Sequence, residues 1–548
     1  MTRILTLIFI FIISHPLIYP CTNLIVGKAA SADGSVICTY NCDGYGFAGF
    51  LTLIPAADHA KGDQRAITDW LSGKTLGYID EPSHTYQVIG HINEKQVCIV
   101  ETTFDGRLEL VNPKGLLDYD TMIKLGLQRA STAREAICVM TDLVAQYGYN
   151  SSGETITVCD KNEAWIMEII GKGPGVKGAV WVAMRVPDDC ICAHANLSRI
   201  RQFPLNDKDN CLYSKDVIRF ARERGYFNGK DTDFSFREAY CPIDFENVRY
   251  ADARVWSFYR HHFNTSEIDK YLPYINGDFD VCDHLPLFLK PDKPVSVRDI
   301  QADMRDHYEG TQLDMTADMS AGPWGMPVRP MPMTFTTNDG HHYFVERPIA
   351  TQKSAFTLVA QLRNWMPDYV GGVMYFNLDD AAMVAYVPVY CCTNKVPDAF
   401  RRDNNNYHEF SEKSAFWMNN FVANMVYPRY SVIMPDLLEA QSELEDFYSR
   451  QVTIDETKVS TLTADEAVAY LTSRTDHYTR CMMERWNQLA RLIIVKHNDQ
   501  VMLESADGRI KPGGKLSYPG YRPQFYEQIG RDTGLRYEMK EYIERNER

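Results

Sequence analysis

The sequence predicts an α+β fold in which strands and helices form separate layers. Three observations predict it. Short apolar runs separated by turn residues fill much of the first 190 positions. Two stretches with helical spacing of apolar residues, 119–129 and 132–147, follow each other in the sequence between these runs. A longer helical pattern follows over 436–494. Since the elements come in blocks, a layered α+β domain is favoured over a regular βαβ series.

The predicted elements follow in chain order. A first hairpin joins 22–26 to 35–40 through a turn at 32–34. The helix over 132–147 opens with Thr132 and has Glu135 three residues later, the pattern of a capping box. The section 205–345 is rich in aromatic residues, aspartate and proline and is expected to form ordered loops and short helices. The remaining predicted elements are strands at 87–92, 97–103, 155–159, 164–170, 180–186, 355–362, 372–377 and 382–390, and helices at 436–448 and 464–494.

Composition excludes several classes of protein. The chain has 548 residues, of which 45% are hydrophobic and 24% charged, as in ordinary globular proteins. Its formal charge of -15 disfavours nucleic-acid binding, because a phosphate backbone would be repelled. Beyond the first residues, no stretch approaches 18 consecutive apolar positions, so no integral membrane span is expected.

The first 20 residues resemble an export signal. A charged start at Arg3 precedes an apolar run over 4–13 and a broken end at 14–20. We therefore expect export to the periplasm or the cell exterior. Pro20 stands where signal peptidases and lipoprotein processing prefer a small residue, so acylation of Cys21 is less favoured than a free Cys21. The predicted division is a signal peptide at 1–20, a main domain at 21–430 and a helical C-terminal extension at 431–548 packed on that domain.

Metal sites and cofactors are not predicted. The 14 cysteines are scattered and include no Cys-x-x-Cys pair, so most are expected to be small buried hydrophobes. The adjacent histidine pairs 261–262 and 341–342 lack the spaced partners of a zinc site.

Cys21 carries the chemistry that the sequence predicts. A cut before it would give one residue both a nucleophilic thiol and a free α-amine. The reference pKa values are about 8.5 for a thiol and about 7.7 to 8.0 for an α-amine, so the amine can accept the thiol proton near neutral pH. No separate catalytic histidine is required.

From Cys21 onward the sequence resembles the dipeptidase A (secernin-related) peptidases, which are N-terminal nucleophile hydrolases. The similarity begins with Cys-Thr-Asn-Leu-Ile-Val-Gly at 21–27 and continues in order to about residue 400. The similar blocks lie at 90–95, 133–136, 147–149, 153–154, 160–165, 181–183, 185–189, 195–200, 305–311 and 386–390. The resemblance implies a four-layer αββα sandwich with the nucleophile at the start of a central strand, and cleavage of short peptides.

The resemblance also points to residues that hold the nucleophile. In the wider superfamily the first hairpin ends in an Arg-Asn-x-Asp segment, which here is Tyr40-Asn41-Cys42-Asp43. Asp43 is retained and is expected to orient the Cys21 amine, unless it is only a solvated turn aspartate. Tyr40 replaces the arginine, so a cation that favours the thiolate is missing or comes from elsewhere.

Other polar residues are candidates for substrate contacts. Asn196 follows a predicted strand and offers an amide donor for an oxyanion, or is a turn asparagine. Arg199 either binds a substrate carboxylate or caps the surface. Arg305, within Arg-Asp-His-Tyr-Glu at 305–309, either binds a substrate carboxylate or belongs to a structural ion-pair loop. Arg363 has the same two interpretations.

The sequence thus predicts an exported cysteine dipeptidase acting on dipeptides or short peptides. Cys21, Asp43 and Asn196 are the predicted catalytic residues, and Arg199 and Arg305 the substrate-binding ones. A homo-oligomer is possible, and the leader is removed by signal peptidase or by Cys21 itself. Two further functions stay open: an amidase or acylase of the same fold acting on N-acyl amino acids, bile conjugates or penicillin-like amides, and a non-catalytic exported binding protein.

Overall fold

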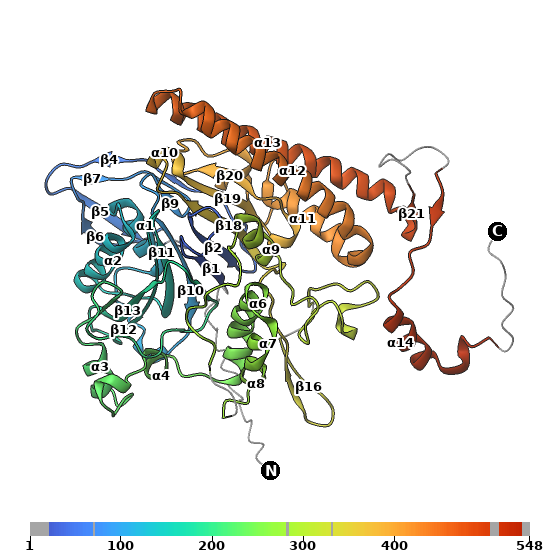
Figure 1. Ribbon diagram of the computed structural model, residues 1–548, viewed down its shortest axis with the longest axis horizontal. Coiled ribbons are helices and arrows are strands. Elements are labelled where there is room, and N and C mark those ends of the chain that lie inside the picture. The colour runs from blue at the N-terminus through green and yellow to red at the C-terminus, as the bar shows by residue number, and fades with distance from the viewer. Residues whose placement is uncertain (1–20, 70–71, 281–283, 330–332, 505–513, 540–548) are drawn as a thin grey trace, which may run out of the picture.

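Two antiparallel β-sheets face each other at the centre of the computed structural model (Figure 1). The structure describes residues 21–69, 72–280, 284–329, 333–504 and 514–539. The predicted export signal at 1–20 lies outside the described residues. The first sheet has the strand order β14-β1-β2-β18-β19-β20. Its strands are β1 (Cys21–Val26), β2 (Val36–Asp43), β14 (Ile191–His194), β18 (Ser354–Leu362), β19 (Gly372–Leu378) and β20 (Val387–Tyr390).

The second sheet has eight strands in the order β15-β13-β12-β11-β10-β9-β8-β3. Short hairpins join β11 to β12 and β12 to β13, whereas residues 105–152, which include two helices, connect β10 to β11. The strands of this sheet are β3 (Leu53–Ile54), β8 (Val88–Ile89), β9 (Ile92–Asn93), β10 (Cys98–Phe104), β11 (Gly153–Cys159), β12 (Ala164–Gly171), β13 (Ala179–Val186) and β15 (Cys211–Tyr213).

The inner faces of the two sheets form the main core. Strands β1 and β2 contact β10, and all six residues of β1 are buried. All eight residues of β12 are buried as well, because one face meets the other sheet and the opposite face meets helices. Burial on both faces explains why these strands are apolar without strict alternation.

Helices cover the outer faces of both sheets (Figure 1). Helices α1 (Tyr119–Arg129) and α2 (Ala133–Tyr147) share a separate core cluster with the eight-stranded sheet. Helices α11 (Ala415–Val426), α12 (Tyr430–Val459) and α13 (Ala464–Lys496) contact β19 and β20 of the six-stranded sheet. Apolar residues of these three helices belong to the same buried cluster as β1. The molecule therefore has a helical layer outside each sheet.

Most predicted elements agree with the observed ones. The helix predicted at 119–129 is α1, and Thr132 caps α2 by accepting a hydrogen bond from the Glu135 amide nitrogen at 3.2 Å. The Glu135 carboxylate accepts a hydrogen bond from the amide nitrogen of Ser131, at 2.8 Å, instead of from that of Thr132.

Some predicted elements are wrong in extent. The strand expected at 87–92 is divided into β8 and β9 because Gly90, with a φ of +58°, turns the chain between them. The strand expected at 382–390 is limited to β20, since 381–383 form a 3₁₀ turn. The helical region begins at α11, earlier than predicted. The hairpin β5 (Gln64–Thr68) and β6 (Thr75–Asp80) was not predicted.

The middle section forms short helices and loops, as predicted. The longest of them, α6 (Ala253–His262), follows a π-helical turn at Val248–Asp252. The other helices here are α3 (Val217–Glu223), α4 (Phe236–Tyr240), α5 (Phe245–Asn247), α7 (Thr265–Ile268), α8 (Leu272–Ile275) and α9 (Val297–Asp303), and α10 (Asp368–Gly371) lies between β18 and β19. Small hairpins pair β4 (Ala57–Asp58) with β7 (His84–Thr85) and β16 (Thr334–Thr336) with β17 (His342–Phe344).

The end of the chain lies apart from the two sheets (Figure 1). It comprises β21 (Met502–Leu503), β22 (Leu516–Ser517) and α14 (Pro523–Thr533). Tyr521 packs edge-to-face on Trp324, with ring centroids 5.2 Å apart, which ties this segment to a loop of the middle section. Within the described residues, none of the helices is both long and apolar enough to cross a bilayer.

Candidate active site

Cys21 is the first residue of β1 and is fully buried between the two sheets. Its sulfur lies 3.7 Å from the Tyr40 hydroxyl and 3.7 Å from the Glu101 Oε1 atom. Cys42 is its direct partner in the antiparallel register of β1 and β2. The sulfur is thus surrounded by β2 of its own sheet and β10 of the facing sheet.

The side chain of Asn196 holds the backbone nitrogen of Cys21. This nitrogen donates to Asn196 Oδ1 at 3.0 Å, and the same oxygen accepts from Arg254 Nη2 at 3.0 Å. The Asn196 Nδ2 donates to the Thr103 carbonyl at 2.7 Å, so this amide nitrogen is already engaged. Asn196 has a φ of +68°, a conformation that asparagine tolerates better than most residues. The geometry favours a role in orienting the nitrogen of Cys21 over the predicted oxyanion contact.

Arg254 fixes the first residues of β1. Its Nη1 donates to the Cys21 carbonyl and to the Thr22 hydroxyl, both at 2.7 Å, and its Nη2 donates to the Ala195 carbonyl at 2.9 Å. The guanidinium is fully buried at the start of α6, next to the π-helical turn, a local distortion common at functional sites. Burial lowers the pKa of Arg254 below its ordinary value.

Asp43 forms a buried ion pair with Arg347 at the end of β2. Both side chains are at most 3% exposed, and the Ser354 hydroxyl also donates to Asp43. Burial lowers the pKa of Arg347 to about 9, and the charge of Cys21 opposes this shift. Arg347 is therefore a cation within electrostatic reach of Cys21, at a site where Tyr40 had replaced the expected arginine.

Two carboxylates, those of Glu101 and Glu154, lie near the Cys21 sulfur. Tyr40 donates to Glu101, while Thr103 donates to Glu154 Oε1 at 3.0 Å and to Glu101 Oε2 at 3.5 Å. Burial raises the pKa of Glu101, and burial and the charge of Glu101 raise that of Glu154. For Cys21, burial, a hydrogen bond with Cys42 and the Glu101 charge raise the thiol pKa, while the Tyr40 hydrogen bond lowers it.

The two predicted substrate-binding arginines lie elsewhere. Arg199 is 1% exposed in its side chain and pairs with Asp252 at 3.2 Å, while its Nη2 donates to the Pro286 carbonyl at 2.6 Å. Arg305 pairs with Glu445 of α12 and donates to the Ala381 and Val384 carbonyls, each at 3.2 Å. Both arginines connect structural elements, because the terminal guanidinium nitrogens of each bind protein oxygens. Arg363 likewise pairs with Glu456 of α12.

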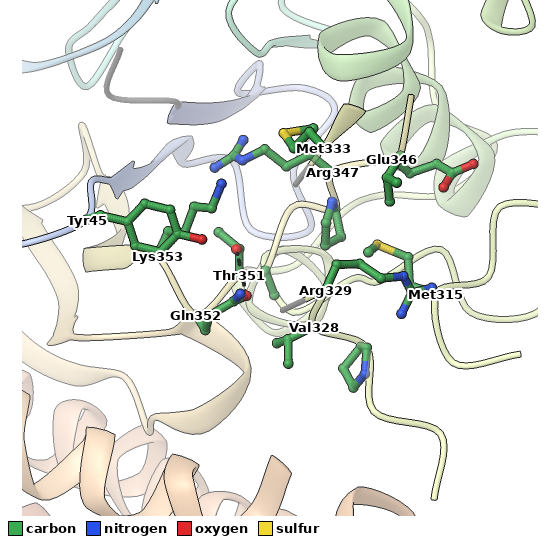
Figure 2. Close-up of a pocket in the computed structure, with 14 residues that line it drawn as sticks. Tyr45, Met315, Val328, Arg329, Met333, Glu346, Arg347, Thr351, Gln352 and Lys353 are labelled. Atoms are coloured by element: carbon green, nitrogen blue, oxygen red, sulfur yellow. Dashed lines mark hydrogen bonds between the residues drawn. The ribbon is translucent and has the colours of Figure 1, made fainter. Parts of the chain in front are cut away.

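Two depressions are lined by residues of this site. The first, here called the aromatic cavity, has a volume of about 290 Å³ and is lined by Cys42 and by Tyr40 and Glu101, which contact the sulfur. The second, the cationic hollow, is lined by Arg329, Arg347 and Lys353 (Figure 2). In Figure 2 Lys353 and Arg347 lie together beside Tyr45, with Arg329 on the opposite side.

Sequence reasoning missed four residues of this site: Glu101, Arg254, Arg347 and Cys42. Glu101 is the one charged residue of strand β10, and Arg254 occupies a buried position of α6. Such a charge on a buried face is a signal in the sequence, since it requires partners. Arg347 lies in a loop, where no pattern marked it. Among the described residues, no group of histidine, cysteine, aspartate or glutamate is suited to hold a metal ion.

The model of peptidase family C69 matches residues 20–443, which include every residue of this site. The chain belongs to peptidase family C69. This confirms the family resemblance seen in the sequence.

Curated relatives of this C69 chain are dipeptidases by name. A probable dipeptidase of Latilactobacillus sakei is 26% identical over 488 residues, 86% of this chain and 94% of the relative. A probable dipeptidase of Salmonella dublin is 26% identical over 391 residues, 68% of this chain and 80% of the relative. Dipeptidase A of Lactobacillus helveticus is 24% identical over 454 residues, which are 79% of this chain and 85% of the relative. The similarity thus covers 68 to 86% of this chain and supports a peptidase.

The Glu101→Gln variant is expected to lower the pKa of the Cys21 thiol. A neighbouring anion disfavours the thiolate, and the neutral amide removes that charge while keeping the side-chain size. The rate of Cys21 alkylation by iodoacetamide, followed against pH, should therefore have its midpoint at lower pH in the variant. Glu409→Gln, at an exposed position, should leave the midpoint unchanged. An unchanged midpoint in Glu101→Gln would show that the carboxylate does not act on the sulfur.

Proposed function

We propose that this C69 protein is an exported cysteine dipeptidase in which Cys21, freed of its leader, is the N-terminal nucleophile. In this proposal the two sheets and their helical layers are the αββα sandwich of N-terminal nucleophile hydrolases. One observation supports it above all: Cys21 begins a central strand with its nitrogen held by Asn196 and its sulfur in contact with Tyr40 and Glu101, two residues that line a cavity.

The proposed cycle uses the two functional groups of Cys21. The α-amine takes the thiol proton, and the thiolate attacks the scissile carbonyl carbon to form a tetrahedral intermediate. The resulting ammonium gives its proton to the leaving amine as the C–N bond breaks, which leaves a thioester. Water attacks the thioester with the amine as base, and the acid product departs. Asn196 and Arg254 orient the amine, and Arg347 stabilises negative charge near the sulfur.

The charges on the two sides of Cys21 match the two ends of a dipeptide. Glu101 and Glu154 offer acidic groups for the substrate's α-ammonium, beside the sulfur. On the side of the cationic hollow, Lys353 has no carboxylate within ion-pair distance among the described residues. Burial and the Arg347 charge lower its pKa to about 8, so a bound carboxylate would be stabilised there. This arrangement favours a dipeptidase over an acylase, whose substrates have no free amine.

The Lys353→Met variant is expected to raise the KM for dipeptides by about 10-fold or more, because it removes the cation for the C-terminal carboxylate. The same substitution should change the KM of the corresponding dipeptide amide much less. Lys395→Met serves as the exposed control. Equal effects on the free acid and the amide would assign Lys353 a structural role instead.

The function is tested by recovering the exported protein, measuring its intact mass and N-terminal sequence, and assaying dipeptides against their N-acetylated forms. A chain that begins with unmodified Cys21 and cleaves only the free-amine substrates supports the proposal. Preference for the N-acetylated forms would favour an acylase, and a chain beginning elsewhere or acylated on Cys21 would overturn the mechanism. If Cys21→Ala is also recovered starting at residue 21, the leader is removed by another enzyme.

A further inference from the structure

We propose that the aromatic cavity receives the side chain of the substrate's N-terminal residue and selects large apolar side chains. The inference rests on the proposed dipeptidase function, and it names the substrates that the function would use. It depends on where the cavity lies, what its walls are made of and how large it is.

The cavity lies next to residues that contact the reacting sulfur. Two groups in contact with Cys21 Sγ, the Tyr40 hydroxyl and Glu101 Oε1, belong to residues that line it. A substrate whose carbonyl carbon lies at the sulfur and whose ammonium binds Glu101 has one remaining group on the same α-carbon. That group is the side chain of its N-terminal residue, which points into the cavity.

The walls are apolar and aromatic. Phe356 packs on Tyr40 with ring centroids 5.2 Å apart, on His91 at 5.4 Å and on Phe376 at 6.0 Å. Burial lowers the pKa of His91 to about 4, so at neutral pH its ring is uncharged. Further walls come from Phe47, Phe50 and Leu51.

The charged residues of the cavity do not demand a charged ligand. Asp120 and Lys124 pair with each other at 2.5 Å and are partly exposed. Arg402 lies over the Phe50 ring, 5.2 Å from its centroid. At about 290 Å³ the cavity accommodates a leucine or phenylalanine side chain, whereas glycine would leave it unfilled.

The expected result is a steep dependence of kcat/KM on the first residue of the substrate. Leu-Ala and Phe-Ala should exceed Gly-Ala by about 10- to 200-fold, the range that one apolar pocket provides. Thr52→Trp, which places an indole at the half-buried lining residue Thr52, should reduce this ratio toward one. Thr68→Trp, at an exposed position of β5, should keep it. Thermal unfolding of both variants shows whether each is folded.

The outcomes separate this inference from the function on which it rests. If the wild-type enzyme cleaves no dipeptide, the proposed function fails. If it cleaves Gly-Ala as well as Leu-Ala and Phe-Ala, the dipeptidase stands and the cavity does not select side chains. A ratio that persists in folded Thr52→Trp would place the selection elsewhere.

A second inference comes from the register of β1 and β2. We infer that Cys21 and Cys42 form a reversible disulfide that inactivates the nucleophile under oxidising conditions. The two residues are direct partners in the antiparallel pair, so their side chains lie on the same face. Opposed Cα atoms in such pairs are about 4.5 to 5.5 Å apart, within the span of a disulfide. Both are thiols in the structure, and Cys42 is half-buried at the aromatic cavity.

The reaction is a two-step thiol–disulfide exchange with a small disulfide such as oxidised glutathione. Cys42 attacks one sulfur of the small disulfide, which forms a mixed disulfide and releases one glutathione. Cys21 then attacks the Cys42 sulfur and releases the second glutathione. The protein thiols lose two hydrogens, and the oxidant is reduced to two thiols. A dithiol reverses both steps.

The test treats mature protein with oxidised glutathione and maps its peptides by mass spectrometry. The expected product is a peptide pair joined through Cys21 and Cys42, two hydrogens lighter than the reduced pair, with alkylation of Cys21 lost and restored by dithiothreitol. Cys21→Ala should instead retain one glutathione on Cys42, and Cys190→Ser should still form the joined pair. Wild-type protein that retains a glutathione on Cys42, or in which both thiols stay alkylatable, would overturn the inference. Because the readout is covalent, it holds whether or not dipeptides are cleaved.

Discussion

The Cys21→Ala variant is expected to lose peptidase activity by about four to six orders of magnitude, the usual result of removing a covalent nucleophile. The fold should remain, because alanine leaves the backbone contacts of Asn196 and Arg254 in place. The measurement is kcat/KM for a dipeptide, together with a urea unfolding curve. Cys21→Ser should be weaker than wild type, since a hydroxyl loses its proton less readily than a thiol.

A matched control for this variant is Cys192→Ala. Cys192 lies in β14, the strand beside β1, and is also fully buried. Its replacement removes a sulfur from the core without touching Cys21, so activity should stay within the same order of magnitude as wild type. Retained activity in Cys21→Ala would exclude Cys21 as the nucleophile and overturn the proposed cycle.

The Arg347→Met variant is expected to lower the free energy of unfolding by about 3 to 5 kcal/mol. It removes one partner of a buried ion pair and leaves the Asp43 carboxylate, which is 0% exposed, without its cation. The double variant Arg347→Met with Asp43→Asn should recover part of this loss, since it removes the uncompensated charge. Activity should fall in both variants, because Arg347 acts on Cys21 electrostatically.

The control for this prediction is an exposed ion pair. Arg401 lies 3.0 Å from Asp403, with side-chain exposures of 51% and 77%. Arg401→Met should change the free energy of unfolding by no more than about 1 kcal/mol, because solvent screens such pairs. A similar small change in Arg347→Met would show that Asp43 is stabilised by other groups, with Ser354 the first to test.

Local sequence patterns predicted those elements whose structure depends on residues close by in the chain. Helices α1 and α2 were predicted closely because a polar cap and an apolar stripe specify them without help from the rest of the fold. Strands β11, β12 and β13 were predicted because short apolar runs separated by turn residues mark them, and short hairpins join them in the structure. The division of 87–92 at Gly90 and the shortening of β20 were missed, since neither the positive φ of Gly90 nor the 3₁₀ turn at 381–383 ends the strand pattern in the sequence.

In the candidate site, too, the sequence marked some residues by their local position and could not assign others. Cys21 and Asp43 were marked by their place in the first hairpin, and Asn196 by its place after a strand. Arg199 and Arg305, predicted as substrate ligands, lie in ion pairs with Asp252 and Glu445, and an arginine in an ion pair looks identical to one in a substrate pocket in a single sequence.

The sequence by itself determined the family, the candidate nucleophile and the hairpin that carries it, because these depend on residue types at short spacing. The tertiary structure decided which groups surround the sulfur. Glu101, Arg254 and Arg347 are separated from Cys21 by between 80 and 326 positions, and only the facing of two sheets, the packing of α6 and the course of the loop before β18 bring them to it. The reason is physical: a carboxylate or guanidinium is stable in a buried strand or helix only when the fold supplies its partners.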